Sequence, residues 1–307
     1  MEASISLKKV GKVLDGRTVL AGLTFGIERG SLMALVGPND AGKTTLLRVL
    51  AGLARPEFGT VFIHGLDTQL RRRETRKTVG YMPQSPNLDL QMTLQENFRF
   101  HAGVYGLSPE ESRRRIRRLA QTFQMTDVLN EFPGSLSQGY LKRAMLVRTL
   151  LHDPPILLLD EPTASLDARS RYIVWEYLQN LKGEKTIVYA TQSIDEAERV
   201  HDRIVIMDKG KIVLDGTLDR LLENTGQLFH FQVRFDALSD DLFARLSKMT
   251  TLVNPSRLGQ IFDFYARERM ALLEVIKVSA DSGLLDYRAD NVGLETLVLT
   301  STEDRQE

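Results

Sequence analysis

Short apolar runs recur along the first two thirds of the chain, and each is followed by a polar or glycine-rich turn and then a helical pattern. The runs are Leu32–Val36, Ile156–Leu159 and Thr186–Ala190. Runs this short and this uniformly apolar are typical of parallel strands that are buried on both faces of a sheet. Because a helical pattern follows each run, the chain predicts an α/β fold with a mostly parallel sheet.

The pattern turns helical in the middle of the chain. Between residues 85 and 135 the strand signals vanish. Within this stretch Ser108, Pro109 and Glu111 mark the start of a helix, with serine as the N-cap, proline at the first helical position and glutamate at the third. We interpret residues 85–135 as a helical subdomain inserted in the sheet domain.

The pattern changes again from about residue 226. Phe229–Phe235 alternates between apolar and polar residues as a half-buried strand does, and Leu242–Met249 has the spacing of a helix. Further strand-like and helical pieces continue to the end. We therefore expect a first domain at residues 1–222 and a small C-terminal α+β domain at residues 226–307.

A phosphate-binding loop follows the first of the buried strands. The chain matches G-x-x-x-x-G-K-[ST] in full, and its backbone N–H groups can curl around a phosphate at the start of the following helix. Lys43 is expected to reach the β- and γ-phosphates of ATP, and the Thr44 hydroxyl to bind Mg²⁺. The pattern predicts a P-loop NTPase fold whose ATP-binding residues are Gly37, Pro38, Asn39, Asp40, Ala41, Gly42, Lys43, Thr44 and Thr45.

Two acidic residues follow the strand Ile156–Leu159. Asp160 and Glu161 then stand at the carboxyl end of a buried strand, where ligands bind in open α/β sheets. We expect Asp160 to hold Mg²⁺ through water, and Glu161 to orient and deprotonate the attacking water. Acidic residues are common at strand ends, so the pair predicts ATP hydrolysis only because the phosphate loop accompanies it.

A third motif separates the families that share a phosphate loop. It resembles the LSGGQ signature of ATP-binding cassette (ABC) proteins and lies shortly before the acidic pair, as in that family. The resemblance implies that this signature completes the ATP site of a second subunit, so that hydrolysis requires a dimer. The motif consists of Leu136, Ser137, Gln138, Gly139 and Tyr140.

Two further segments resemble elements of the same family in the same order. Gln84 resembles the glutamine that touches Mg²⁺ and reports occupancy to the membrane partner. Ser165, Leu166 and Asp167 resemble the loop that contacts the other subunit of the dimer. The resemblance covers roughly residues 4–222 and implies ATP and Mg²⁺ as ligands.

The C-terminal stretch resembles, more loosely, the tail of ATPases that drive exporters of the drug and polysaccharide (ABC-2) type. The resemblance implies an ATPase subunit that powers transport, and export in particular, through separate polytopic membrane subunits. No apolar run in the chain approaches the roughly 20 residues that a membrane-spanning helix needs. We therefore expect a peripheral protein at the cytoplasmic face of the cell membrane.

Composition adds little to this picture. The chain has 40 Lys and Arg residues and 40 Asp and Glu residues, so it has no overall attraction for nucleic acid or anionic lipid. It has no cysteine, which excludes disulfides and cysteine metal sites. The arginine-rich stretch at residues 113–118 lies beside Glu110 and Glu111, and we interpret it as a solvated helix face with ion pairs rather than a nucleic-acid site.

Three residues depart from the family pattern. Gln192 stands where the family has a histidine, and a capping box formed by Ser193 and Glu196 fixes that alignment. An amide can bond a phosphate but cannot carry a proton at neutral pH. Leu14 stands near where an aromatic residue should stack on adenine. Asp40 replaces a glycine, and aspartate tolerates a positive φ better than most residues if one is needed there. We expect its carboxylate to point away from the phosphates, because like charges repel.

Two other functions fit parts of the sequence. A catalytically weak partner in a heterodimeric transporter is favoured by Gln192 and Leu14, whereas the retained Glu161 and Lys43 oppose it. A soluble cassette ATPase that acts on ribosomes or DNA is the second alternative. Such proteins typically carry two cassettes or a long coiled-coil insertion, and this chain shows one cassette, so transport is the favoured function.

Overall fold

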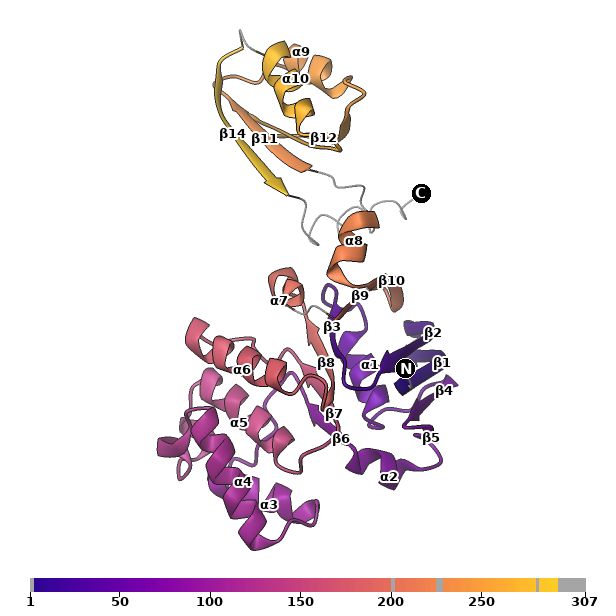
Figure 1. Ribbon diagram of the computed structural model, residues 1–307, viewed down its shortest axis with the longest axis vertical. Helices are drawn as coiled ribbons and strands as arrows, with labels where there is room; N and C mark the ends of the chain where they lie inside the picture. The colour runs from indigo at the N-terminus through magenta and orange to yellow at the C-terminus, as the bar shows by residue number, and fades with distance from the viewer. Residues whose placement is uncertain (1–2, 200–201, 225–228, 280–281, 292–307) are drawn as a thin grey trace. The chain divides into compact units, whose positions relative to one another are not determined.

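The structure is a computed structural model that describes residues 3–199, 202–224, 229–279 and 282–291 (Figure 1). The chain divides into two compact units, Met1–Gly216 and Thr217–Glu307. Each unit has an apolar core of its own. None of the helices in the described residues combines the length and the apolarity that a bilayer crossing requires.

The first unit is built around a six-stranded sheet. Its strands, in sheet order, are β10 (Lys211–Gly216), β9 (Arg203–Asp208), β3 (Leu32–Val36), β8 (Thr186–Thr191), β7 (Ile156–Asp160) and β6 (Val79–Met82). Five of the strands, β9, β3, β8, β7 and β6, run parallel to one another, and β10 runs antiparallel to β9. Every residue of β3, β7 and β8 is buried, which confirms the predicted parallel sheet.

A four-stranded antiparallel sheet completes the first unit. Its strands, in sheet order, are β2 (Arg17–Glu28), β1 (Ala3–Leu14), β4 (Phe58–Ile63) and β5 (Leu66–Asp67). Helix α1 (Lys43–Leu50) lies between the two sheets (Figure 1) and packs its leucines against both. Asp15 and Gly16 join β1 to β2 with φ values of 49° and 77°, as a tight two-residue hairpin turn requires.

Helices cover the other face of the large sheet. They include α5 (Gln138–Leu150) and α6 (Ala168–Asn180), and the short α7 (Ile194–Glu198) follows β8. Helix α2 (Arg72–Lys77) precedes β6. The stretch predicted to be helical contains α3 (Leu94–Val104), α4 (Pro109–Thr122) and the 3-10 turns Thr126–Val128 and Pro133–Ser135. As predicted, Ser108 caps α4, because its hydroxyl accepts a bond from the Glu111 N–H at 3.2 Å.

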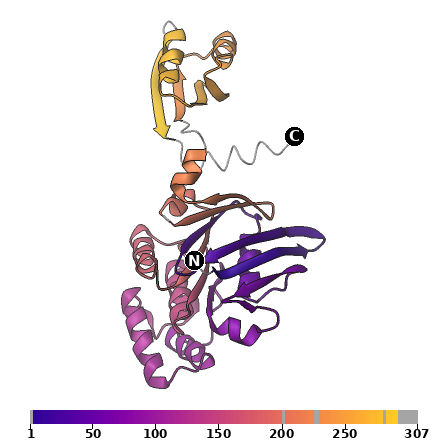
Figure 2. The same ribbon diagram turned by 45° about the vertical axis from the view of Figure 1, so that its right-hand side comes forward.

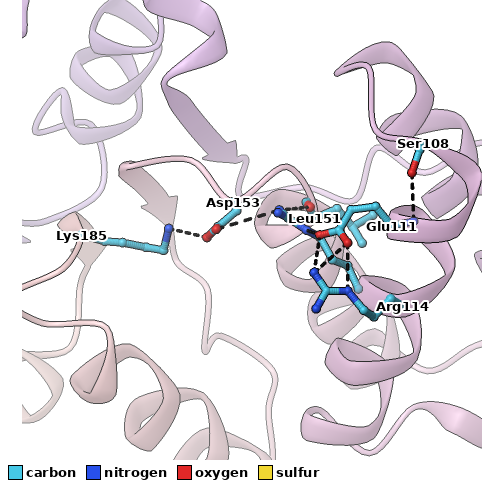
Figure 3. Close-up of polar contacts among 7 residues, drawn as sticks. Ser108, Glu111, Arg114, Leu151, Asp153 and Lys185 are labelled. Atoms are coloured by element: carbon cyan, nitrogen blue, oxygen red, sulfur yellow. Dashed lines mark hydrogen bonds and ion pairs between the residues drawn. The ribbon is translucent and has the colours of Figure 1, made fainter.

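The arginine-rich face of α4 is held by one carboxylate (Figure 3). Glu111 accepts bonds from Arg114 at 2.8 and 2.9 Å and from Arg115 at 2.5 Å, which confirms the ion pairs expected along this helix. Arg115 also donates to the Leu151 carbonyl at 3.0 Å. Arg115 thus ties α4 to the residue after α5, whereas Arg114 pairs within its own helix.

The second unit consists of one helix and a small α+β body. Its sheet has the order β12 (Leu252–Leu258), β13 (Ile261–Ala266), β11 (Phe229–Phe235), β14 (Leu284–Asn291), and helix α8 (Leu218–Asn224) precedes it. Helices α9 (Asp240–Ser247) and α10 (Met270–Val278) pack on one face of this sheet (Figure 2). Alternate residues of β11, namely Phe231, Val233 and Phe235, point into that core, as the sequence pattern predicts.

Candidate functional site

The phosphate loop connects β3 to α1, and glycines at its two ends allow its path. A Cβ built on Gly37 would lie 2.2 Å from the Met207 carbonyl oxygen, and one on Gly42 would lie 2.6 Å from that of Val19. Gly42 also has φ 99°, which side chains rarely adopt. Asp40 has φ 65°, a left-handed conformation that aspartate tolerates better than most residues.

Lys43 begins α1 and folds back over the loop. Its ammonium donates to the carbonyl of Gly37 at 2.6 Å and to that of Pro38 at 2.8 Å. Burial lowers the pKa of Lys43, and the nearby carboxylates of Glu161 and Asp160 oppose that shift. The loop therefore holds a partly desolvated ammonium at the place where a phosphate would enter.

The acidic pair stands at the end of β7, beside the phosphate loop. Burial raises the pKa of Asp160, and a hydrogen bond with the Thr44 side chain opposes this shift. Burial also raises the pKa of Glu161, which Lys43 and a hydrogen bond from the Gln192 side chain oppose. Gln192 therefore lies close to the carboxylate that we expect to act as the base.

The carboxylates leave two oxygen atoms available for a cation. Among the described residues, Asp160 Oδ2 and Glu161 Oε1 are buried and have no hydrogen-bond partner. Buried anionic oxygens are costly unless a positive charge or a donor compensates them. Carboxylate, hydroxyl and amide oxygens are hard ligands of the kind that Mg²⁺ prefers, and Thr44 and Gln84 supply the latter two. The residues present therefore fit a magnesium ion.

One cleft of about 640 Å³ gathers most of the groups predicted to bind ATP, although the predicted Gly37 and Pro38 are not part of its lining. Its lining includes Leu14, Asn39, Asp40, Ala41, Gly42, Lys43, Thr44, Thr45, Gln84, Asp160, Glu161 and Gln192. Asp15, Arg17, Thr18 and Val19 line it as well. Phosphate loop, acidic pair and Gln192 come from segments far apart in the sequence, and the parallel sheet brings them to one edge.

The signature segment lies elsewhere on the first unit. Ser137 caps α5 by accepting a bond from the Tyr140 N–H at 3.4 Å, and Ser137 and Gln138 are exposed. A Cβ built on Gly139 would lie 3.7 Å from the carbonyl oxygen of Ser165, which has φ 67°. Residues 136–140 and 165–167 do not contribute to the cleft lining, and within one chain all of them except the buried Leu166 are at least partly exposed.

Comparison with known proteins assigns the chain to a family. The family model for ABC transporter matches residues 20–164. The "Nod factor export ATP-binding protein I" of Burkholderia orbicola is 36% identical over 223 residues, which cover 72% of this chain and 73% of that protein. The chain belongs to the ABC transporter family. The protein of the same name from Cupriavidus metallidurans is 31% identical over 310 residues, 99% of this chain and 100% of that one.

Solved structures of ABC proteins share the fold of the first unit. The ATP-binding subunit of an ABC transporter matches with a TM-score of 0.68 and 32% identity, over 72% of this chain and 93% of that one. A dimeric ATP-binding cassette in a post-hydrolysis state with ADP and Pi matches with a TM-score of 0.65 and 28% identity. The match covers 70% of this chain and 98% of that one. The chain is therefore an ATP-binding subunit of the ABC ATPase type.

Two cations near the ABC-type site were not predicted from the sequence. Arg17 lines the cleft because the hairpin pairs it with Leu14, and the Asp15-Gly16 dipeptide is a local signal that could have indicated it. Lys142, on α5, is buried and donates to the carbonyl of Gln84 at 2.6 Å and to that of Glu161 at 3.0 Å. It links the helix after the signature to both site segments.

The predicted capping box after β8 is only half correct. The Ser193 hydroxyl accepts a bond from the Glu196 N–H at 3.3 Å, as expected. The prediction is wrong for the reciprocal bond, which would run from the Ser193 N–H to the Glu196 carboxylate. The Ser193 N–H instead donates to Thr191 Oγ1 at 3.0 Å. The Glu196 carboxylate instead turns inward to buried hydroxyl groups, which bind it better than a solvated N–H does.

The second unit is expected to be dispensable for nucleotide binding. Every residue that lines the cleft precedes residue 193. A chain that ends at residue 222 should therefore bind MgATP with the affinity of the full chain, as titration calorimetry would measure. Loss of binding in a shortened chain that circular dichroism shows to be folded would contradict this expectation.

Proposed function

We propose that the chain is the ATP-hydrolysing subunit of an exporter, working as a dimer with a second ATP-binding subunit on separate membrane-spanning subunits at the cytoplasmic face of the membrane. The observation that carries the proposal is the meeting of Lys43, Glu161 and Gln192 in one cleft. The direction of transport is supported by the relatives named for export, which match 72–99% of this chain.

Each group in the cleft has a task in this proposal. Lys43 binds the β- and γ-phosphates, and Glu161 accepts a proton from the attacking water. Gln192 lines the same cleft as Glu161 and would orient its carboxylate. Mg²⁺, when bound, neutralises developing phosphate charge, and Thr44, Gln84 and Asp160 would hold it. Leu14 and the planar guanidinium of Arg17 offer an apolar and a stacking contact for adenine.

The position of the signature segment supports the proposed dimer of two ATP-binding subunits. The exposed Ser137 and the Gly139 amide stand at the start of α5, where backbone N–H groups and the helix dipole favour a phosphate. These groups would complete the cleft of a second subunit. Ser165 and Asp167 are exposed beside them and would contact that subunit as well.

The proposal is tested by isolating the chain with its partners. Affinity purification of the tagged chain from detergent-solubilised membranes should recover a polytopic protein in a stable ratio, and the complex should hydrolyse MgATP. Recovery of ribosomes or DNA in place of a membrane protein would favour the soluble cassette class and overturn the proposal.

A second candidate function is a catalytically weak subunit in a heterodimer. It is favoured by Gln192, whose amide stands in the cleft with the expected base but carries no titratable proton. In that case the partner subunit supplies most of the hydrolysis. Inactivation of Glu161 would then leave the steady-state rate of the complex nearly unchanged, whereas the leading proposal requires a large loss.

Replacing Gln192 by His is expected to raise the rate of hydrolysis several-fold. An imidazole can offer a positive charge to the transition state, and such a charge-assisted contact contributes about 1.5–3 kcal/mol, or about 10- to 100-fold in rate. Steady-state turnover of the membrane complex measures the change, with Gln91→His at an exposed position as the matched control. An unchanged or lower rate would show that Gln192 is an equivalent phosphate sensor.

A further inference from the structure

A buried carboxylate is hydrogen-bonded to the two segments that carry the hydrolytic groups. Glu196, on α7, is 8% exposed and accepts hydrogen bonds on both of its oxygens. Thr163 Oγ1 donates to Oε1 at 2.6 Å, and Thr191 Oγ1 donates to Oε2 at 2.8 Å. The Tyr189 hydroxyl donates to Oε2 as well, and its oxygen lies 2.6 Å from Thr163 Oγ1.

The donors belong to the two segments that carry the hydrolytic pair. Thr163 comes two residues after Glu161, and Thr191 comes immediately before Gln192. The Glu161 N–H donates to the carbonyl of Ala190 at 2.9 Å, so the same two segments also meet through their backbones. The carboxylate of Glu196 thus sets the distance between the turn after β7 and the end of β8.

The backbone of Glu161 needs such support. Its φ is 48°, a left-handed conformation that costs free energy for any residue other than glycine. A conformation of this kind persists only where the surrounding structure holds it. Two contacts can hold it: the Glu161 N–H bonds the Ala190 carbonyl at the end of β8, and Thr163, two residues further on, bonds Glu196.

We infer that Glu196, with the hydroxyls of Tyr189, Thr163 and Thr191, is a positioning unit that holds Gln192 against Glu161. This inference rests on the proposed function, because it assigns a role in ATP hydrolysis. The Arg171 guanidinium, whose Nε lies 3.8 Å from Glu196 Oε1, also donates to the Leu166 carbonyl at 3.2 Å. The unit therefore extends to the loop that we expect to contact the second subunit.

The packing of Tyr189 in the core does not depend on its hydroxyl. The Tyr189 ring already packs on Trp175, with ring centroids 4.6 Å apart, and it is fully buried. Burying a carboxylate with three hydroxyls gains little over an apolar core of the same shape. What the polar cluster adds is fixed geometry, and misplacement of reacting groups by about 1 Å can cost about 10²-fold in rate.

The test removes single hydroxyls and measures hydrolysis in the membrane complex. Tyr189→Phe retains the ring and removes only the hydroxyl. Thr163→Val removes the Thr163 hydroxyl and keeps the size of the side chain. Each should lower kcat about tenfold, as loss of a supporting hydrogen bond does, and leave the KM for ATP within about twofold. Thr163→Ser, which restores the hydroxyl, should recover most of the rate lost in Thr163→Val.

A double-mutant cycle separates positioning from a general loss of structure. If the unit acts through Gln192, adding Tyr189→Phe to Gln192→Ala should lower kcat by less than about twofold further, because coupled residues are not additive. Fully additive losses, or an unchanged kcat in Tyr189→Phe and Thr163→Val beside an active wild type, would overturn this inference alone. A wild-type complex without MgATP hydrolysis would overturn the proposed function, and this inference with it.

Discussion

Glu161→Gln is expected to lower MgATP hydrolysis about 10²- to 10⁴-fold while ATP binding stays intact, because the amide keeps the shape of the side chain but cannot accept the proton of the attacking water. The carboxylate stands in the cleft with one oxygen that lacks a hydrogen-bond partner among the described residues. The substitution also removes a negative charge near the phosphates. If the affinity for ATP changes, we therefore expect it to increase. Steady-state release of phosphate measures the rate, and titration with MgATP measures the binding.

Glu184→Gln provides the matched control for this variant. Glu184 is exposed and does not line the cleft, so the same change there should leave the rate unaltered. An ATP-bound dimer that accumulates in Glu161→Gln, seen by size-exclusion chromatography, is the corresponding positive result. Wild-type turnover in Glu161→Gln would reject the assignment of the base.

Lys43→Met is expected to lower both the rate of hydrolysis and the affinity for ATP. The methionine keeps an apolar stem in the buried position but removes the ammonium that bonds Gly37 and Pro38 and would bind the phosphates. Loss of a positioned donor of this kind costs about 10²–10³ in kcat, and the affinity for ATP should fall about 10- to 100-fold. The combined loss distinguishes this variant from Glu161→Gln, in which binding persists.

Lys182→Met is the control for the loss of a lysine. Lys182 is exposed and pairs with the half-buried Asp202 at 2.6 Å, and a pair with one exposed partner at the surface contributes little. Both variants should be checked for folding by their melting temperatures. Near-normal ATP affinity in a folded Lys43→Met would show that the phosphates bind to other groups.

Local sequence patterns predict the elements that carry the site. The apolar run Leu32–Val36 coincides with β3, and the alternating Phe229–Phe235 coincides with β11. Both patterns depend on residues within a few positions of one another, as do helix caps such as Ser108. The phosphate loop is predictable for the same reason, since its whole motif lies within nine consecutive residues.

Contacts between distant segments are not predictable in this way. The sequence suggests that Glu196 caps α7, but its carboxylate is bound by hydroxyls that lie 5, 7 and 33 positions away. Lys142 reaches carbonyls 58 and 19 positions away, and nothing in its own neighbourhood indicates this. Such partners are set by the packing of the sheet and its helices, so they become visible only in the fold.

The position of β3 in the large sheet has a consequence for how the chain is made. The residues that β3 and the turn before it contact come much later in the chain. The Gly30 N–H bonds the Thr186 hydroxyl 156 positions away, and the Leu32 N–H bonds Asp202 170 positions away. Ribosomes add about 5–20 residues per second, so about 10 to 30 seconds separate the synthesis of β3 from that of its neighbours. The β1–β2 hairpin can form at once, whereas an apolar strand waits unpaired on the nascent chain and is a natural binding site for chaperones.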